Sequence, residues 1–177
     1  MNDATIRAAG VEDAATVATL FSEFNALLGA DGLPGEAAFA AENVNVSASQ
    51  MARRLASMEG VESTLLAETP EGPAGLCCLR LVSYIGQDAP YAEVTQLYVR
   101  AAYKRRGIGA LLLRAAEAMA RAEGATCMHI ITGSDNPDAQ VFYRAQGYIS
   151  ETVVFDKYFA VGAQHAAPLR QDEGAHA

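Results

Sequence analysis

The stretch that decides the fold of this chain is YKRRGIGALLL, residues 103–113. Before it comes EVTQLYV at 93–99, rich in β-branched and aromatic residues, and after it an amphipathic run reaches Gly124. This order predicts a strand, a basic turn with glycines and a helix. The first N–H groups of such a helix have no partner within it, and the helix dipole adds positive charge there. The turn is therefore suited to an anion, above all a phosphate.

Glycines and basic side chains strengthen this interpretation. Gly107 and Gly109 carry no Cβ, so a ligand can approach the backbone closely. Three basic residues beside them add positive charge: Lys104, Arg105 and Arg106. A leucine stands where the dinucleotide fingerprint needs its third small residue, and the Gly-Lys-Ser or Gly-Lys-Thr of a P-loop does not occur. The remaining alternative is an ordinary surface turn with basic residues.

Composition indicates one globular domain. The chain has 177 residues, 51% of them hydrophobic and 19% charged, which is enough to bury a core. It has no apolar run near the ~18 residues of a transmembrane helix and no signal-peptide pattern at its N-terminus. Its three cysteines do not suggest a disulfide framework, so we expect a cytoplasmic protein without a membrane partner. A net charge of −8 argues against nucleic acid and weakly favours a cationic substrate.

Hydrophobic spacing and turn residues predict the remaining elements. Strands are expected at 5–8, 63–68, 74–85, 91–99, 127–132, 148–150 and 152–159, the second and third as an antiparallel hairpin. Four helices are expected: at 12–28, from Ser47, at 107–123, and from Asn136 to Gly147. Gly29 should end the first helix, and Gln50 should be the capping-box partner of Ser47 in the second. Residues 29–46 are expected to form a long loop, and 161–177 a disordered tail after a folded domain at 1–160.

Two motifs resemble those of the GNAT superfamily of acyl-CoA-dependent N-acetyltransferases. The first is KRRGIG at 104–109, where the family has Arg or Gln, two residues, Gly, one residue, and Gly or Ala. Lys104 departs from the usual first residue but keeps its charge. The second is NPDAQVFYRAQGY at 136–148, which has the family's Asn, aromatic-Tyr, three residues, and Gly-aromatic. The resemblance covers roughly 4–159 and implies the GNAT fold, an α/β (α+β mixed) class with a mixed, mostly antiparallel twisted sheet of about seven strands and about four helices.

The resemblance implies that acetyl-CoA is the acyl donor. In the family, the strand before the turn carries a bulge and separates from its neighbour, which exposes backbone groups to the pantetheine arm. The amide of Leu97 or its neighbour would then stabilise the oxyanion that develops from the thioester. The amides of 105–110 would hold the pyrophosphate, while Asn136 either touches the pantetheine or only caps its helix. The implied cofactor-binding residues are Gln96, Leu97, Tyr98, Val99, Lys104, Arg105, Arg106, Gly107, Ile108, Gly109, Ala110, Asn136 and Tyr143.

Tyr143 and Glu93 are the candidate catalytic residues. A phenol at the place of Tyr143 can give a proton to the coenzyme A thiolate as it leaves, although an amphipathic core tyrosine is the alternative. Glu93 lies fourteen residues before Gly107, as does the catalytic glutamate of some histone-acetylating members. The alternatives for it are an exposed strand carboxylate and a water chain as base. Cys127 is expected to be a buried core cysteine, and with His129 it lacks the further ligands that a metal site needs.

The sequence therefore predicts an N-acetyltransferase that moves an acetyl group from acetyl-CoA to a primary amine of a small molecule. We expect direct transfer in a ternary complex, because proximity alone supplies much of the rate. Loop 29–46, the second helix and the final hairpin are the expected acceptor-selecting surfaces. Two alternatives stay open: a peptide or protein N-acetyltransferase of the same family, and a non-catalytic acyl-CoA-binding sensor module. The resemblance is also compatible with a homodimer.

Overall fold

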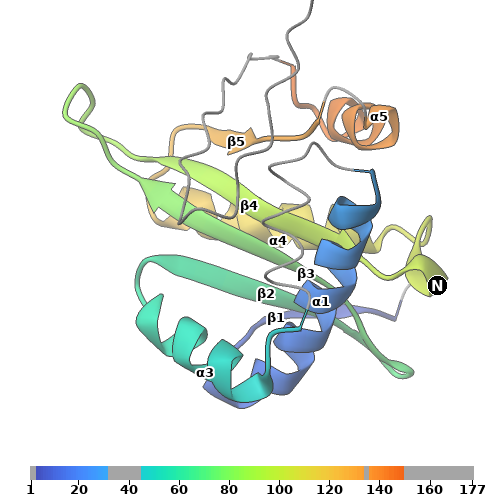
Figure 1. Cartoon of the computed structure of the whole chain (residues 1–177). Helices are drawn as coiled ribbons and strands as arrows, with labels where there is room; N and C mark the ends of the chain where they lie inside the picture. The colour runs from blue at the N-terminus through green and yellow to red at the C-terminus, as the bar shows by residue number, and fades with distance from the viewer. Residues whose placement is uncertain (1–2, 32–44, 134–135, 150–177) are drawn as a thin grey trace, which may run out of the picture.

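The computed structural model describes residues 3–31, 45–133 and 136–149 (Figure 1). Its strands are β1 (Thr5–Ala8), β2 (Glu62–Thr69), β3 (Gly72–Val82), β4 (Tyr91–Val99) and β5 (Met128–Ile130). Its helices are α1 (Ala14–Asp31), α3 (Ala48–Ser57), α4 (Ile108–Ala122) and α5 (Pro137–Ala145), with short 3-10 turns η1 (Val11–Asp13) and η2 (Ala101–Tyr103). In this part of the chain, helices long and apolar enough to cross a membrane do not occur.

The five strands form one mixed sheet in the order β1-β2-β3-β4-β5. Neighbours from β1 to β4 are antiparallel, and β5 is parallel to β4. The predicted hairpin of β2 and β3 is confirmed, and the chain returns through α4 to the parallel strand β5. This architecture is the mixed sheet with flanking helices that the sequence predicts.

Helices cover both faces of the sheet. Successive residues of a strand point to opposite faces, so β3 directs Leu76 and Cys78 to one side and Cys77 and Leu79 to the other. The first pair packs in a core with α1 and α3, which lie in front of the sheet in Figure 1. The second pair packs against α4, which lies behind it. The sheet therefore separates two hydrophobic cores.

Local signals begin α3 and α5 at the predicted places. Ser47 Oγ accepts a hydrogen bond from the Gln50 amide at 3.2 Å, and Gln50 Oε1 accepts one from the Ser47 amide at 2.9 Å. The capping box is thus complete. At α5, Asn136 Oδ1 accepts from the Ala139 amide at 3.1 Å, and a proline occupies the first helical position.

Several predicted boundaries are wrong. The first helix passes through Gly29 and ends at Asp31, because a single glycine costs a helix only about 1 kcal/mol. The third strand ends at Val82 rather than 85, followed by exposed residues at 83–88. The final strands and most of loop 29–46 lie outside the described residues, as does the tail 161–177, so seven strands stay a prediction. The described residues 148 and 149 are not in a strand.

The strand expected at 127–132 differs most from its prediction. It spans only Met128–Ile130, and Cys127 and His129 are exposed rather than buried. Its apolar residues predicted a buried strand, but β5 pairs through three residues at the end of the described sheet order. The His129 ring packs instead on Tyr91 of β4, with the ring centroids 4.6 Å apart.

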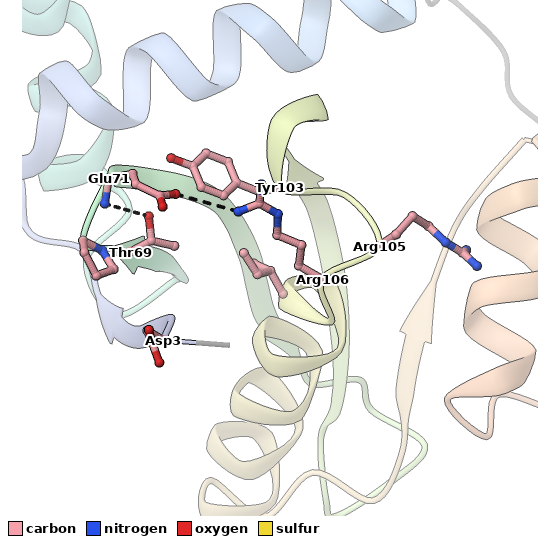
Figure 2. Close-up of a pocket in the computed structure, with 8 residues that line it drawn as sticks. Asp3, Thr69, Glu71, Tyr103, Arg105 and Arg106 are labelled. Carbon is pink, nitrogen blue, oxygen red and sulfur yellow. Dashed lines mark hydrogen bonds and ion pairs between the residues drawn. The ribbon is translucent and has the colours of Figure 1, made fainter. Parts of the chain in front are cut away.

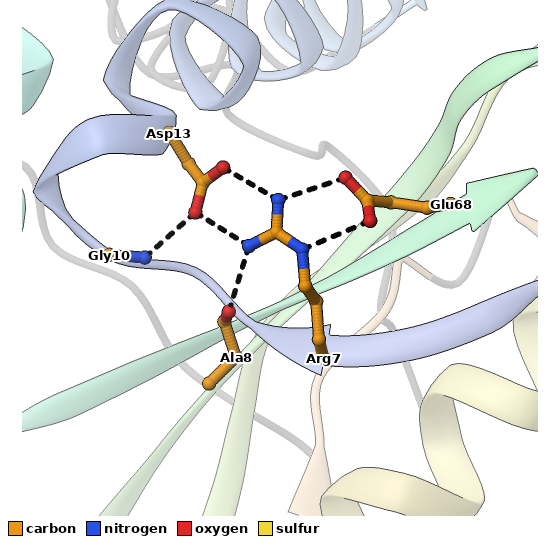
Figure 3. Close-up of polar contacts among 5 residues, drawn as sticks. All are labelled: Arg7, Ala8, Gly10, Asp13 and Glu68. Atoms are coloured by element: carbon orange, nitrogen blue, oxygen red, sulfur yellow. Dashed lines mark hydrogen bonds and ion pairs between the residues drawn. The ribbon is translucent and has the colours of Figure 1, made fainter.

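Arg7 fastens the N-terminal strand to its neighbours (Figure 3). Its guanidinium donates to both oxygens of Asp13, each at 2.7 Å, and to both oxygens of Glu68 at 2.8 and 3.0 Å. The hydrogen bonds from Arg7 hold the pKa of both carboxyls below its usual value. One side chain thus joins β1, η1 and β2.

Candidate active site

β4 carries a bulge just before the basic turn. Cys78 of β3 pairs with Gln96, whereas the next β3 residue, Leu79, pairs with Val94. Thr95 is therefore an extra residue on β4, and such an insertion bends a strand locally. The family resemblance implies a bulge in this strand, and the structure has one.

Beyond the bulge, β4 is unpaired on its outer side within the described residues. β5 pairs only with 92–94. The Arg100 amide donates to the Ala74 carbonyl at 2.9 Å, so these two opposite residues form a hydrogen-bonded pair. The next pair along the strands, Val99 with Gly75, is therefore a non-hydrogen-bonded pair. Because these pairs alternate along antiparallel strands, Leu97 belongs to another one. The backbone groups of Leu97 and Val99 therefore face away from β3, into the gap that β5 leaves.

The other two predicted strand residues face differently. By the same alternation, the backbone groups of Gln96 and Tyr98 face β3. The Tyr98 ring is buried against α1, where its hydroxyl donates to Glu23 Oε2 at 3.2 Å. Leu97 and Val99 are thus the two of the four whose backbone can meet a ligand in the gap.

The turn after β4 leaves amides without partners at the start of α4. Gly107 is the N-cap with a φ of 80°, a left-handed conformation that favours glycine, and Arg105 has a φ of 64°. The Leu111 amide makes the first helical bond, to the Gly107 carbonyl at 3.1 Å. The three amides before it, at 108–110, make no hydrogen bond with any residue that the structure describes. They form the predicted anion-binding arrangement.

Gly109 shows where these amides lie relative to the gap. A Cβ at this position would stand 3.4 Å from the Phe142 ring of α5 and 3.8 Å from Cγ2 of Val99. The first turn of α4, the end of β4 and α5 therefore meet at this glycine. Sequence positions as far apart as 99 and 142 are brought to one place.

Arg105 and Arg106 point in opposite directions (Figure 2). Arg105 extends toward α5, whereas Arg106 turns to the β2–β3 hairpin, where its Nη1 lies 3.8 Å from Glu71 Oε2. The Arg106 guanidinium also lies 5.3 Å above the centroid of the Tyr103 ring. Lys104 is exposed and makes no ion pair with another described residue.

The cavity in Figure 2, about 420 Å³ in volume, lies on the hairpin side of this turn. Asp3 and Glu71 contribute two carboxylates to its lining, and Arg105 and Arg106 contribute two guanidinium groups. These charges offset one another, whereas the unpaired amides of 108–110 present only donors to an anion. The amides, not this cavity, are the better anion site.

Tyr143 lies on α5 and packs against the core beneath the sheet. Its ring contacts those of Phe142 and Tyr148 edge-on, with centroids 5.4 and 6.0 Å away. Its hydroxyl makes no hydrogen bond with a described residue. Among the described residues, every fully buried side-chain oxygen has a hydrogen-bond partner, so the Tyr143 hydroxyl is not fully buried. Burial, with a smaller contribution from Cys77, raises the pKa of Tyr143 to about 12, so the phenol keeps its proton. Cys77 is the β3 partner of Leu97, which places Tyr143 near the gap.

Glu93 is farther from the gap. It lies four residues before Leu97, roughly 10–13 Å along the strand. Its Oε2 accepts from Arg80 Nε at 2.9 Å and lies 2.7 Å from Arg80 Nη2, and 16% of its side chain is exposed. The structure thus places the predicted base in an ion pair, away from the outward-facing backbone of Leu97.

Sequence reasoning missed Glu62, the first residue of β2. Its Oε1 accepts a hydrogen bond from the hydroxyl of Thr95, the bulge residue. Glu62 also lines a second cavity, of about 290 Å³, on the sheet face that α1 and α3 cover. Strand periodicity assigns a residue to a face but not to a partner two strands away, so the sequence carries no signal for this contact.

The cysteines and acidic residues suggest other chemistry only weakly. Burial raises the pKa of the Cys77 thiol to about 12 and also raises that of Cys78, so both stay protonated. Cys127 Sγ lies 3.6 Å from His129 Nε2. The described part of the chain contains no group of three or more His, Cys, Asp or Glu side chains that could hold a metal ion.

A model of the acetyltransferase (GNAT) family matches residues 38–148. The chain is similar in fold to an aminoglycoside acetyltransferase from an uncultured soil metagenomic sample, solved in complex with sisomicin, with a TM-score of 0.73, 16% identity, and coverage of 91% of this chain and 98% of that one. A second aminoglycoside acetyltransferase from such a sample gives a TM-score of 0.69, 20% identity, and coverage of 89% and 99%. A transcriptional regulator from Bacillus halodurans C-125 gives a TM-score of 0.71, 18% identity, and coverage of 88% of this chain and 99% of that one. None of the curated proteins matches the chain.

Proposed function

We propose that this chain, which belongs to the acetyltransferase (GNAT) family, transfers an acetyl group from acetyl-CoA to a primary amine of a small molecule. The transfer is direct, within a ternary complex. The observation that carries the proposal is the convergence of two sets of unpaired amides, on β4 and at the start of α4, at a gap that Tyr143 borders.

The two sets of amides suit the two ends of the donor. The amides of 108–110 lie unpaired at a helix N-terminus, an arrangement that favours an anion and so fits the pyrophosphate. The outward backbone of Leu97 and Val99 fits the amide groups of the pantetheine arm, which can pair with it as a strand would. Arg105 adds positive charge on the side of α5. Asn136 already accepts a hydrogen bond from the Ala139 amide, which supports its capping role.

The residues of the gap then have distinct roles in the reaction. The Leu97 amide donates to the thioester oxygen as negative charge develops on it, and such a donor is worth roughly 3 kcal/mol in other enzymes. Attack by the amine forms the C–N bond and breaks the C–S bond. Tyr143 gives its proton to the departing sulfur, and the proton lost from the nitrogen balances it.

Two findings favour a small amine over a peptide as acceptor. Two solved structures of similar fold are described as aminoglycoside acetyltransferases, and the net charge of −8 favours a cation. The three cysteines are free thiols, which fits a reducing compartment, so we propose that the protein is cytoplasmic. A homodimer stays an expectation from the family.

The test is a thiol-release screen of amines and peptides with acetyl-CoA, combined with calorimetric titration of coenzyme A. We expect heat of binding and release of thiol with at least one small amine. Release with peptides alone would favour the peptide acetyltransferase. Binding without release from any acceptor would favour a sensor module, and no heat at all would contradict the placement of the donor.

A further inference from the structure

We propose that Glu62 binds the ammonium group of the acceptor and takes its proton, and that the acceptor is a small primary amine with an apolar body. The inference rests on the proposed function. It concerns the cavity of about 290 Å³ between the sheet and the helices α1 and α3.

The cavity has apolar walls and a polar floor. Phe21 of α1 and Met51 and Leu55 of α3 supply apolar surface. Glu62 and Gln96 line it from the sheet, and Gln96 is the residue directly after the bulge. A volume of about 290 Å³ is at the small end of the range for ligand pockets. Such a site suits a short carbon chain that ends in one polar group.

Glu62 is the carboxylate that lies beside the bulge. The Thr95 hydroxyl donates to its Oε1, and Thr95 is two residues from Leu97, whose amide faces the gap. An amine held by Glu62 therefore lies near the predicted position of the thioester carbon. Glu93 lies farther along the strand, and its carboxylate is already bound by Arg80.

The charges on this face leave Glu62 for a ligand. Glu62, Arg80 and Glu93 stand in register across β2, β3 and β4. Arg80 forms its ion pair with Glu93 at 2.7 Å, whereas Glu62 makes no ion pair with a described residue. The Thr95 hydroxyl that donates to Glu62 is neutral, so this hydrogen bond does not cancel the charge of Glu62. Arg54 also lines the cavity, and the Cys78 thiol is the other titratable group there.

The proton balance assigns one step to Glu62. An N–H bond of the ammonium breaks, its electron pair stays on nitrogen, and Glu62 becomes a neutral carboxylic acid. The nitrogen then attacks the acetyl carbon and loses a second proton, which restores the phenol of Tyr143 after Tyr143 has given its own proton to sulfur. The proton on Glu62 passes to solvent after the reaction, so one proton is released in each turnover.

The test compares Glu62→Gln with Glu93→Gln, two matched changes of a carboxylate to an amide. Glutamine keeps an oxygen for the Thr95 hydroxyl, so folding should persist, and melting temperatures check this. We expect Glu62→Gln to lower kcat/KM for the best amine by roughly 10²- to 10⁴-fold near neutral pH. Part of the loss should return as the pH rises, because solution then supplies the neutral amine. Coenzyme A affinity should not change, and Glu93→Gln should have a smaller effect.

The outcomes separate this inference from the proposed function. Wild-type kcat/KM in Glu62→Gln, or an equal loss in Glu93→Gln, would overturn the role of Glu62 while acetyl transfer stands. Absence of thiol release by the wild-type protein would overturn both. For the substrate class, an n-alkyl monoamine should have a higher kcat/KM than an aminoglycoside, and the opposite order would contradict the apolar acceptor.

Discussion

The hydroxyl of Tyr143 combines the properties that a proton donor to a departing thiolate needs. Burial raises its pKa to about 12, its hydroxyl is not fully buried, and its ring packs against two aromatic neighbours. The same residue could serve only packing, and substitution distinguishes the two roles. Because packing depends on the ring and proton donation on the oxygen, removal of the oxygen alone is informative.

We expect Tyr143→Phe to lower kcat by one to a few orders of magnitude, with unchanged coenzyme A affinity. Thiol release and calorimetry measure these two quantities. Tyr148→Phe is the control, since its hydroxyl is directed to Met128 Sδ at 3.1 Å instead. A raised pKa keeps Tyr143 protonated at alkaline pH, so wild-type turnover should not fall through its deprotonation between pH 7 and 10. Wild-type kcat in Tyr143→Phe would remove it from the mechanism.

At the scale of elements, the turns and helix caps around the junction of β4, α4 and α5 could be predicted from the sequence. The turn with Gly107 was predictable, because glycine suits its positive φ and the adjoining patterns are regular. The capping residues Ser47 and Asn136 were predictable for a similar reason, since each acts within three residues of its own position.

Contacts between distant strands were not predictable in this way. The place of Glu62 at the bulge depends on register across three strands, and periodicity carries no register. The exposure of Cys127 and His129 depends on where β5 lies in the sheet order, which hydrophobicity alone does not specify. Similarly, KRR at 104–106 suggested three equivalent charges, whereas the turn directs Arg105 and Arg106 to opposite sides.

This divergence at the turn yields a prediction with a built-in control. Arg105→Gln should weaken coenzyme A binding by about 2- to 5-fold and reduce its salt dependence, since an exposed charge contributes about 0.2–1 kcal/mol. Arg106→Gln, which removes the same charge beside Glu71, should change affinity less. Calorimetry at two salt concentrations measures both. A larger loss in Arg106→Gln would place the phosphates on the hairpin side.

At the scale of the whole molecule, the guanidinium groups of Arg100 and Arg7 form ion pairs that join helices and strands outside the two hydrophobic cores. Arg100, just after β4, donates to both oxygens of Glu23 on α1, at 2.9 and 2.8 Å, and so ties the helix over the sheet. Arg7 does the same for β1, η1 and β2. Because α1 forms one wall of the proposed acceptor cavity, its attachment to β4 bears on both stability and the shape of that cavity.

These ion pairs make the stability of the fold depend on pH in the acidic range. The hydrogen bond from Arg100 is the main cause that lowers the pKa of Glu23 below 4.5, and Arg7 lowers those of Asp13 and Glu68. A carboxyl whose pKa is lower in the folded state stabilises the fold above its unfolded pKa and loses that effect as the pH falls through the folded pKa. We therefore expect the melting temperature to decrease steadily below about pH 4.5. Glu23→Gln should lower the melting temperature at pH 7 and flatten its decrease in acid, whereas Glu59→Gln, a change at an exposed glutamate, should do neither. If Glu23→Gln keeps the full acid dependence of the wild type, the Arg100 pair is not one of its sources.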